Sequence, residues 1–298
     1  MLALAQRVLL VVVAVAALAW WLLSAGWPLP LRVVVLLAIA LPHAGFMALE
    51  FLLQSRWGDP APAPHPTAAQ RLRAWWGEVW NGVLVFGYRQ PFASNAVPDE
   101  ADVARHQGRR GVVLVHGFVC NRGLWNPWLR RLSAQGTPFV AVNLEPVLGS
   151  INDYVPIVDA AVARIEQATG RPALIVAHSM GGLATRAWLH QREADARCAG
   201  VITIGTPHHG TWLGRFAFSR NGQQMRRSSR WLATMAATEH AARLAKFVCF
   251  FGHCDNIVFP AGTATLEDAD NRHLAAVAHV AMVGRPEVFA ELQRQLAI

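Results

Sequence analysis

The sequence predicts an α/β protein whose mostly parallel sheet has as few as six strands and follows an N-terminal transmembrane helical hairpin. Short apolar runs alternate with amphipathic segments from residue 111 onward, which is the pattern of a parallel sheet. One of these runs breaks at Ser179 between small residues, as a strand does when it turns sharply into a helix. The first 53 residues are overwhelmingly apolar and the remainder is not.

Six apolar runs are the predicted strands. They cover residues 112–115, 139–143, 173–177, 201–205, 247–251 and 274–277. Residues 153–169 carry apolar side chains near helical spacing, and Gly170 follows as a stop, so a helix is predicted before the third strand. About 190 residues are enough to bury one core. Residues 111–298 are therefore predicted to form one domain.

The apolar region 1–56 is predicted to be the membrane hairpin. Residues 8–27 contain no charge and, at about 1.5 Å per residue, match a hydrocarbon core about 30 Å thick. Residues 33–53 form a second apolar run, and the turn between the runs contains Pro, Gly and Trp, which suits a membrane interface. A cleaved signal peptide is the alternative interpretation of the first run.

Residues 57–110 are predicted to connect the hairpin to the domain. Alternate prolines over residues 59–66 favour a stiff, extended spacer. Residues 68–86 mix arginine with tryptophan. This composition suits either a helix in the lipid headgroup region or a helix packed on the domain.

Ser179 is interpreted as a nucleophile. A serine hydroxyl is weakly nucleophilic, so it must be exposed on a strained turn where a base can reach it. The usual pattern is G-x-S-x-G, and here Ala177 replaces the first glycine while Gly181 keeps the second. Both residues are small enough for the arms of the turn to approach each other.

A His-Gly turn about 60 residues before Ser179 lies where an oxyanion loop belongs. The backbone N–H groups of Phe118 and Met180 are the predicted donors to a tetrahedral intermediate. The residues predicted to contact the substrate lie beside these donors: His116, Gly117 and His178.

The acid and the base are predicted to follow the nucleophile in the chain. Asp255 lies just past the fifth predicted strand, where catalytic groups gather in parallel sheets. Its rivals Asp268 and Asp270 lie in a polar stretch with no strand before them. His279 follows a short apolar segment about 24 residues after Asp255 and is the predicted base, with His273 as the alternative.

Four segments together resemble the bacterial triacylglycerol lipase and esterase branch of the α/β-hydrolases. They read HGFVCN at 116–121, AHSMGG at 177–182, GTPHHG at 205–210 and DNIV at 255–258. The resemblance covers roughly residues 110–298. It implies an α/β-hydrolase fold and hydrolysis of carboxylic esters of lipids or other hydrophobic acyl compounds, with Ser179, Asp255 and His279 as the triad.

Two other functions use the same features. An acyltransferase would pass the acyl group from the same triad to an alcohol, and a non-catalytic membrane protein of this fold would bind a partner. A missing triad member would mark the latter, and none is missing. Residues 211–246 are longer than a connection needs and rich in apolar side chains, so they are predicted to be a lid or surface helices.

Charge and membrane pattern predict the location. Arginines flank the two ends of the hairpin more than its turn, which favours a cytoplasmic domain on a bacterial inner membrane. The net charge is +8, and the arginines that produce it are scattered along the chain rather than gathered in one patch with interleaved aromatic residues. We therefore expect this charge to attract lipid headgroups rather than nucleic acid. The pair His208 and His209 lacks a second pair at ligand spacing, and we expect neither metal nor cofactor.

Overall fold

A six-stranded parallel sheet forms the centre of the region from residue 112 onward. The computed structural model describes residues 1–298, the side chains of residues 103 and 104 excepted. The strand order is β2-β1-β3-β4-β5-β6, and all neighbouring strands run parallel. The strands are β1 (Val112–Val115), β2 (Phe139–Ala141), β3 (Ala173–His178), β4 (Cys198–Ile204), β5 (Phe247–Gly252) and β6 (Asp270–Leu274). The predicted six-stranded parallel sheet is confirmed.

The last predicted strand is displaced. Residues 274–277 were expected to pair, but β6 begins at Asp270 and shares only Leu274 with that range. β6 is an edge strand whose first residues are exposed, so polar side chains are tolerated there and the apolar pattern misleads. The apolar residues after Leu274 instead form the turn that leads to His279.

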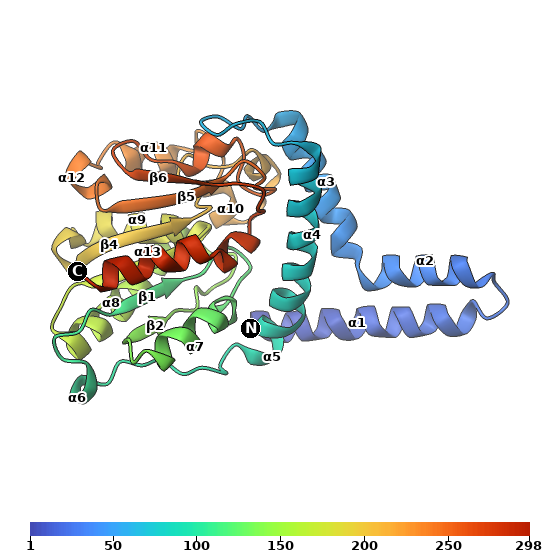
Figure 1. The fold of residues 1–298 in the computed structure, drawn as a ribbon, viewed down its shortest axis with the longest axis horizontal. Helices are drawn as coiled ribbons and strands as arrows, with labels where there is room; N and C mark the ends of the chain where they lie inside the picture. The colour runs from blue at the N-terminus through green and yellow to red at the C-terminus, as the bar shows by residue number, and fades with distance from the viewer.

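Helices cover both faces of the sheet (Figure 1). Alternate strand residues point to opposite faces, so Val113 and Val115 pack with α8 and α9, whereas Val112 and Leu114 pack with α7 and α13. Gly170 ends α8 in a left-handed conformation, as predicted. The helices of this region are α6 (Val103–His106), α7 (Asn126–Ala134), α8 (Val155–Thr169), α9 (Met180–Gln191), α10 (Arg220–Gln224), α11 (Arg230–Ala236), α12 (Ala241–Leu244) and α13 (Pro286–Leu296).

The N-terminal region differs from the predicted hairpin of two spans. α1 (Leu2–Leu23) is, among the described residues, the one helix long and apolar enough by itself to cross a membrane. The second run is divided into α2 (Leu29–Ala40) and α3 (Pro42–Trp57), which are bent by 71° and would count as a second span only if taken together. Pro42 causes the break because it lacks an amide hydrogen and its ring clashes with the preceding turn. A multi-pass topology is therefore not supported.

α1 and α2 lie side by side and project away from the sheet, whereas α3 and α4 (Ala68–Leu84) lie across the end of the sheet and pack on the loops there (Figure 1). Phe51 of α3 and Ala74 of α4 share a buried cluster with Cys254 and Ala278. Residues 68–86 were predicted to form either a helix in the lipid headgroup region or a helix packed on the domain. In the structure this helix packs on the domain. A π-helical turn (Val85–Arg89) and α5 (Gln90–Ala93) complete this region.

Between Thr211 and Lys246, the long connection from β4 to β5 contains four short helices. The first is a 3₁₀ helix (Trp212–Phe216), and the other three are α10, α11 and α12. Its first part is tied to the loop after β5, because the Thr211 hydroxyl donates to the carbonyl of Ile257 at 2.5 Å. Phe216 and Phe218 are 66% and 84% exposed. This segment therefore presents aromatic side chains at the surface beside the carboxyl end of the sheet.

Candidate active site

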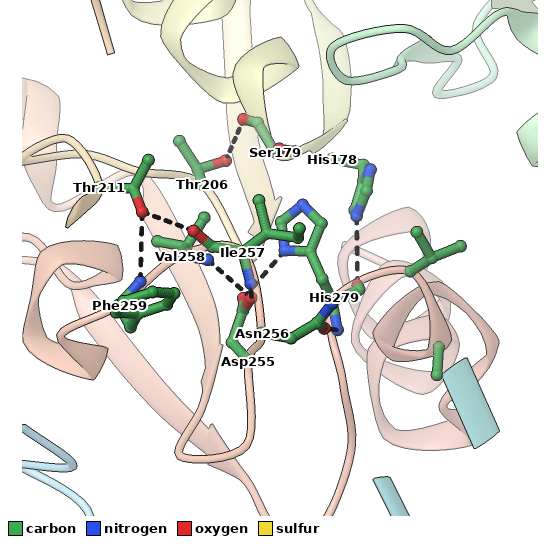
Figure 2. Close-up of polar contacts among 12 residues, drawn as sticks. His178, Ser179, Thr206, Thr211, Asp255, Asn256, Ile257, Val258, Phe259 and His279 are labelled. Atoms are coloured by element: carbon green, nitrogen blue, oxygen red, sulfur yellow. Dashed lines mark hydrogen bonds and ion pairs between the residues drawn. The ribbon is translucent and has the colours of Figure 1, made fainter. Parts of the chain in front are cut away.

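Ser179 lies on a strained turn between β3 and α9. Its φ of 54° and ψ of −128° are unfavourable for a residue with a side chain. The turn is held by two hydrogen bonds, from Ser179 N–H to the Ile204 carbonyl at 2.8 Å and from the Thr206 hydroxyl to the Ser179 carbonyl at 2.9 Å (Figure 2). The strain is thus maintained by β4 and the loop that follows it.

Two glycines after Ser179 make this close approach possible. A Cβ on Gly181 would lie 2.5 Å from the Val115 carbonyl oxygen, and one on Gly182 would lie 2.2 Å from the Thr206 hydroxyl. Neither neighbour is the free end of a flexible chain. The small residues that this turn requires therefore include both glycines on the helix side.

Asp255 and His279 are paired beneath the turn. Asp255 Oδ2 lies 2.9 Å from His279 Nδ1, and Asp255 Oδ1 accepts the N–H groups of Ile257 and Val258 at 2.8 Å each (Figure 2). Both side chains are buried. Because the two amides hold one carboxylate oxygen, the other is aimed at the imidazole and orients it.

The charge environment of His279 favours its protonated form. Burial opposes a charged imidazole, but the Asp255 carboxylate, its hydrogen bond and two further carboxylates outweigh burial and raise the pKa of His279. The neighbouring His178 ring is 4.7 Å away, centroid to centroid. Burial first, and His279 second, hold the pKa of His178 well below its ordinary value, so His178 is neutral.

The loop after β1 approaches the turn closely. A Cβ on Gly117 would lie 2.7 Å from Ser179 Cβ. Phe118 lines the same cavity as Ser179, and Met180 is the first residue of α9, where an N–H has no partner within the helix. Both predicted oxyanion donors thus belong to segments that flank Ser179.

His116 is engaged elsewhere. Its Nδ1 lies 2.9 Å from the Gly117 carbonyl, and its Nε2 accepts the N–H of Leu144 at 3.0 Å. Burial lowers the pKa of His116 to about 4. The structure brings His178 to the cavity, but it commits both nitrogens of His116 to the backbone.

A cavity of about 500 Å³ contains Ser179 and His279, within the range of small-molecule sites. The loop after β1, the segment after β4 and helices α3 and α4 form its walls. Its apolar lining includes Phe46, Met47, Phe118, Leu213, Phe216 and Met225. The arrangement suits an apolar ligand whose reactive group lies at Ser179.

The rival residues lie apart from this cavity. Asp270 is bonded to Arg272 on β6 at 2.6 Å, and Asp268 is exposed. The His273 ring contacts His253 and Phe251, with centroids 4.5 and 5.5 Å apart. Of the alternatives considered for the acid and the base, only Asp255 and His279 are brought together.

Comparison with known families matches residues 112–296 to the alpha/beta hydrolase family. The chain belongs to this family. Two similar solved structures are lipases, each 20% identical to this hydrolase-family chain and covering 64% of it. The Bacillus licheniformis lipase BlEst2 in mature form has a TM-score of 0.57 with 93% of its chain covered, and the Aspergillus fumigatus lipase B has 0.58 with 53% covered. At this identity the likeness concerns the fold, and a comparison with curated proteins finds no match.

Sequence reasoning missed several residues around the site of this alpha/beta hydrolase. Glu50 and Glu78 come from helices before the matched region, yet both line the cavity. Asn256 donates to Glu50 at 2.7 Å and accepts the N–H of His279 at 3.3 Å. The one sequence feature that could have indicated such contacts is a charged residue within an apolar run, as Glu50 is.

Gly205 offers a test of the Asp255–His279 pair. Its φ is +56°, and a Cβ would lie 3.1 Å from both Asp255 Oδ2 and His279 Nδ1. If Asp255 and His279 act in catalysis, Gly205→Ala is expected to lower kcat by roughly tenfold to a hundredfold, because small misplacements of catalytic groups are costly. The matched control is Gly284→Ala, where a Cβ would meet nothing within 4 Å. Equal kcat in the two variants would contradict the assignment of this pair.

Proposed function

We propose that this alpha/beta hydrolase is a membrane-anchored serine hydrolase that cleaves carboxylic esters of lipids or other hydrophobic acyl compounds through an acyl-enzyme. One observation carries the proposal. Ser179 on its strained turn and His279, bonded to buried Asp255, line one apolar cavity. A strained serine and a buried Asp–His pair at the same opening are the arrangement expected of an active site.

The proposed chemistry uses these groups in order. Ser179 Oγ attacks the ester carbonyl carbon while His279 Nε2 takes its proton, and Asp255 keeps the proton on Nδ1 and stabilises the imidazolium. The amides of Phe118 and Met180 stabilise the oxyanion. His279 then gives the proton to the leaving alcohol, and water repeats the sequence to release the acid.

The lining of the cavity supports a hydrophobic acyl group as the substrate. Apolar side chains dominate the walls, and Phe216 and Phe218 extend the apolar surface outward from the cavity. In this proposal the first part of the segment after β4, from Thr211 to α10, acts as a lid over the acyl chain.

Membrane attachment is proposed to come from α1, assisted by α2. α1 has 22 residues and therefore extends about 33 Å. None of its residues is buried. Close to the turn between the two helices lie Trp20 and Trp21 of α1 and Arg32 of α2, with the Arg32 guanidinium 4.1 Å from the Trp21 ring, as expected for headgroup contacts. Because α3 continues from α2 and lines the cavity, a substrate would reach Ser179 from the bilayer.

One preparation tests both parts of this proposal. Membranes containing the full chain are washed with alkaline carbonate, dissolved in detergent and assayed with p-nitrophenyl esters of increasing acyl length. We expect the chain in the washed pellet, turnover that rises toward long acyl chains, and labelling of Ser179 by a fluorophosphonate probe. Folded protein that neither turns over any ester nor reacts with the probe would refute the hydrolase.

A further inference from the structure

Two buried glutamates reach the loops of Asp255 and His279 from outside the region that matches the family. Glu50 lies on α3 and Glu78 on α4, whereas the match begins at residue 112. Both line the cavity with Ser179 and His279. A buried carboxylate is costly unless it is well paired, so their partners indicate what they do.

Glu78 holds the backbone immediately after His279. Its Oε1 accepts the N–H of Val280 at 2.8 Å, and its Oε2 accepts the N–H of Ala281 at 3.0 Å. The side chain of Glu78 is 1% exposed. Since both carboxylate oxygens are bound to adjacent amides, the position and the orientation of this turn depend on α4.

Glu50 acts on the same histidine through Asn256. The Asn256 amide donates to Glu50 Oε2 at 2.7 Å, and the Asn256 side-chain oxygen accepts the N–H of His279 at 3.3 Å (Figure 2 shows the second contact). Asn256 also directly follows Asp255. On the same helix, Gln54 donates to the carbonyl of His253 at 2.9 Å, so α3 holds the acid's loop as well.

The two carboxylates also affect the charge at His279. Both favour its protonated form, which is the form that develops when Ser179 loses its proton. Burial raises the pKa of Glu78 to about 7, against the two amide bonds that lower it. At neutral pH Glu78 is therefore charged in only part of the molecules, and it supports the imidazolium fully only above that pH.

We propose that Glu78 and Glu50 are positioning residues for His279, so that α3 and α4 complete the catalytic site. The inference rests on the proposed hydrolase function. It means that the helices joined to the membrane segment do more than tether the domain, because they hold the acid and base loops in register with Ser179.

The titratable groups near Glu78 must be considered in any pH test. They come from α3, from the loop after β1, from the turn at Ser179 and from the two triad loops: His43, Glu50, Cys120, His178, Asp255 and His279. His178 is neutral, and burial raises the pKa of Cys120 to about 12. Neither of these two groups therefore changes its charge between acid and neutral pH.

The test compares Glu78→Gln with the full-length wild type, each normalised to the fraction of Ser179 that reacts with a fluorophosphonate. A glutamine cannot accept both amides equally and carries no charge. We expect kcat to fall roughly tenfold to a hundredfold, with KM changed less. The acid limb of kcat/KM should move to lower pH, because His279 loses an anion that raises its pKa.

Glu50→Gln separates charge from geometry and serves if Glu78→Gln fails to fold. The side-chain oxygen of a glutamine at position 50 can still accept the hydrogen bond from Asn256, but the charge is gone. The acid limb should therefore move to lower pH, with a smaller loss of kcat than in Glu78→Gln. The control is Glu291→Gln, a buried carboxylate on α13 bound to Arg272 and Arg294, which should leave the limb in place. Wild-type kcat, or an unmoved limb, in both cavity variants would overturn the inference. Wild-type protein without Ser179-dependent turnover would instead refute the hydrolase itself.

Discussion

Replacement of Ser179 by alanine is expected to lower kcat for long-chain ester hydrolysis by roughly 10⁴- to 10⁶-fold. The hydroxyl removed is the proposed nucleophile, and the residual rate would come from the oxyanion donors and from binding. Ser179 is 6% exposed, and its backbone bonds to Ile204 and Thr206 do not involve the hydroxyl. The variant should therefore fold, with a thermal midpoint close to that of the wild type.

The cavity offers a second serine as the matched control. Ser219 lines the same cavity, and its hydroxyl accepts the N–H of Gly222 at 3.2 Å at the start of α10. Ser219→Ala should keep kcat within the order of magnitude of the wild type and leave fluorophosphonate labelling intact. If Ser219→Ala abolished labelling while Ser179→Ala retained it, the nucleophile would be misassigned.

Asp255→Asn is expected to lower kcat by about 10⁴-fold while the fold is kept. The amides of Ile257 and Val258 donate to Oδ1, so an asparagine would place its carbonyl there and turn its NH₂ toward His279 Nδ1. That donor forces the proton of the neutral imidazole onto Nε2. An Nε2 that carries a proton cannot accept one from Ser179, so only the minor tautomer with a free Nε2 still acts as the base, although the geometry is retained.

Two measurements check this result. The remaining activity should have its acid limb at lower pH than the wild type, since the Asp255 carboxylate raises the pKa of His279. Asp270→Asn is the control, because Asp270 lies on the exposed edge strand and pairs with Arg272, and its kcat should equal that of the wild type. A comparable loss in the Asp270 variant would reopen the choice of acid.

Much of the fold could be predicted because its signals are local. β1 matches the predicted range, and β3, β4 and β5 differ from theirs by a few residues at their ends, since buried parallel strands are continuous apolar runs. β6 was displaced because an edge strand is only half buried and its polar first residues follow no apolar pattern. The prediction that residues 33–53 form a second membrane span was wrong for a different reason. Pro42 was visible in the sequence, but whether the segment after it stayed in line with α2 or turned away depended on whether α3 had a protein surface to pack against.

The candidate site divides in the same way. The turn at Ser179 has a local signature, the small residues on either side, so it could be recognised from consecutive residues although distant segments hold it. The order of Ser179, Asp255 and His279 was also readable, because parallel strands deliver their following loops to one edge of the sheet. The fold brings the side chains of Asp255 and His279 within hydrogen-bond distance. Their role in catalysis stays a prediction.

By itself, the sequence determined the six-stranded α/β architecture, the turn at Ser179 and the apolar character of α1. Only the tertiary structure decided that α2 and α3 part at Pro42, that α4 lies on the domain, and that Glu50 and Glu78 meet the loops of Asp255 and His279. The physical reason is the range of the interactions. The small residues around Ser179 and the apolar runs of the strands are patterns among neighbouring residues, whereas the bond between Glu78 and the amide of Val280 joins positions 202 residues apart, and no periodicity in the chain records it.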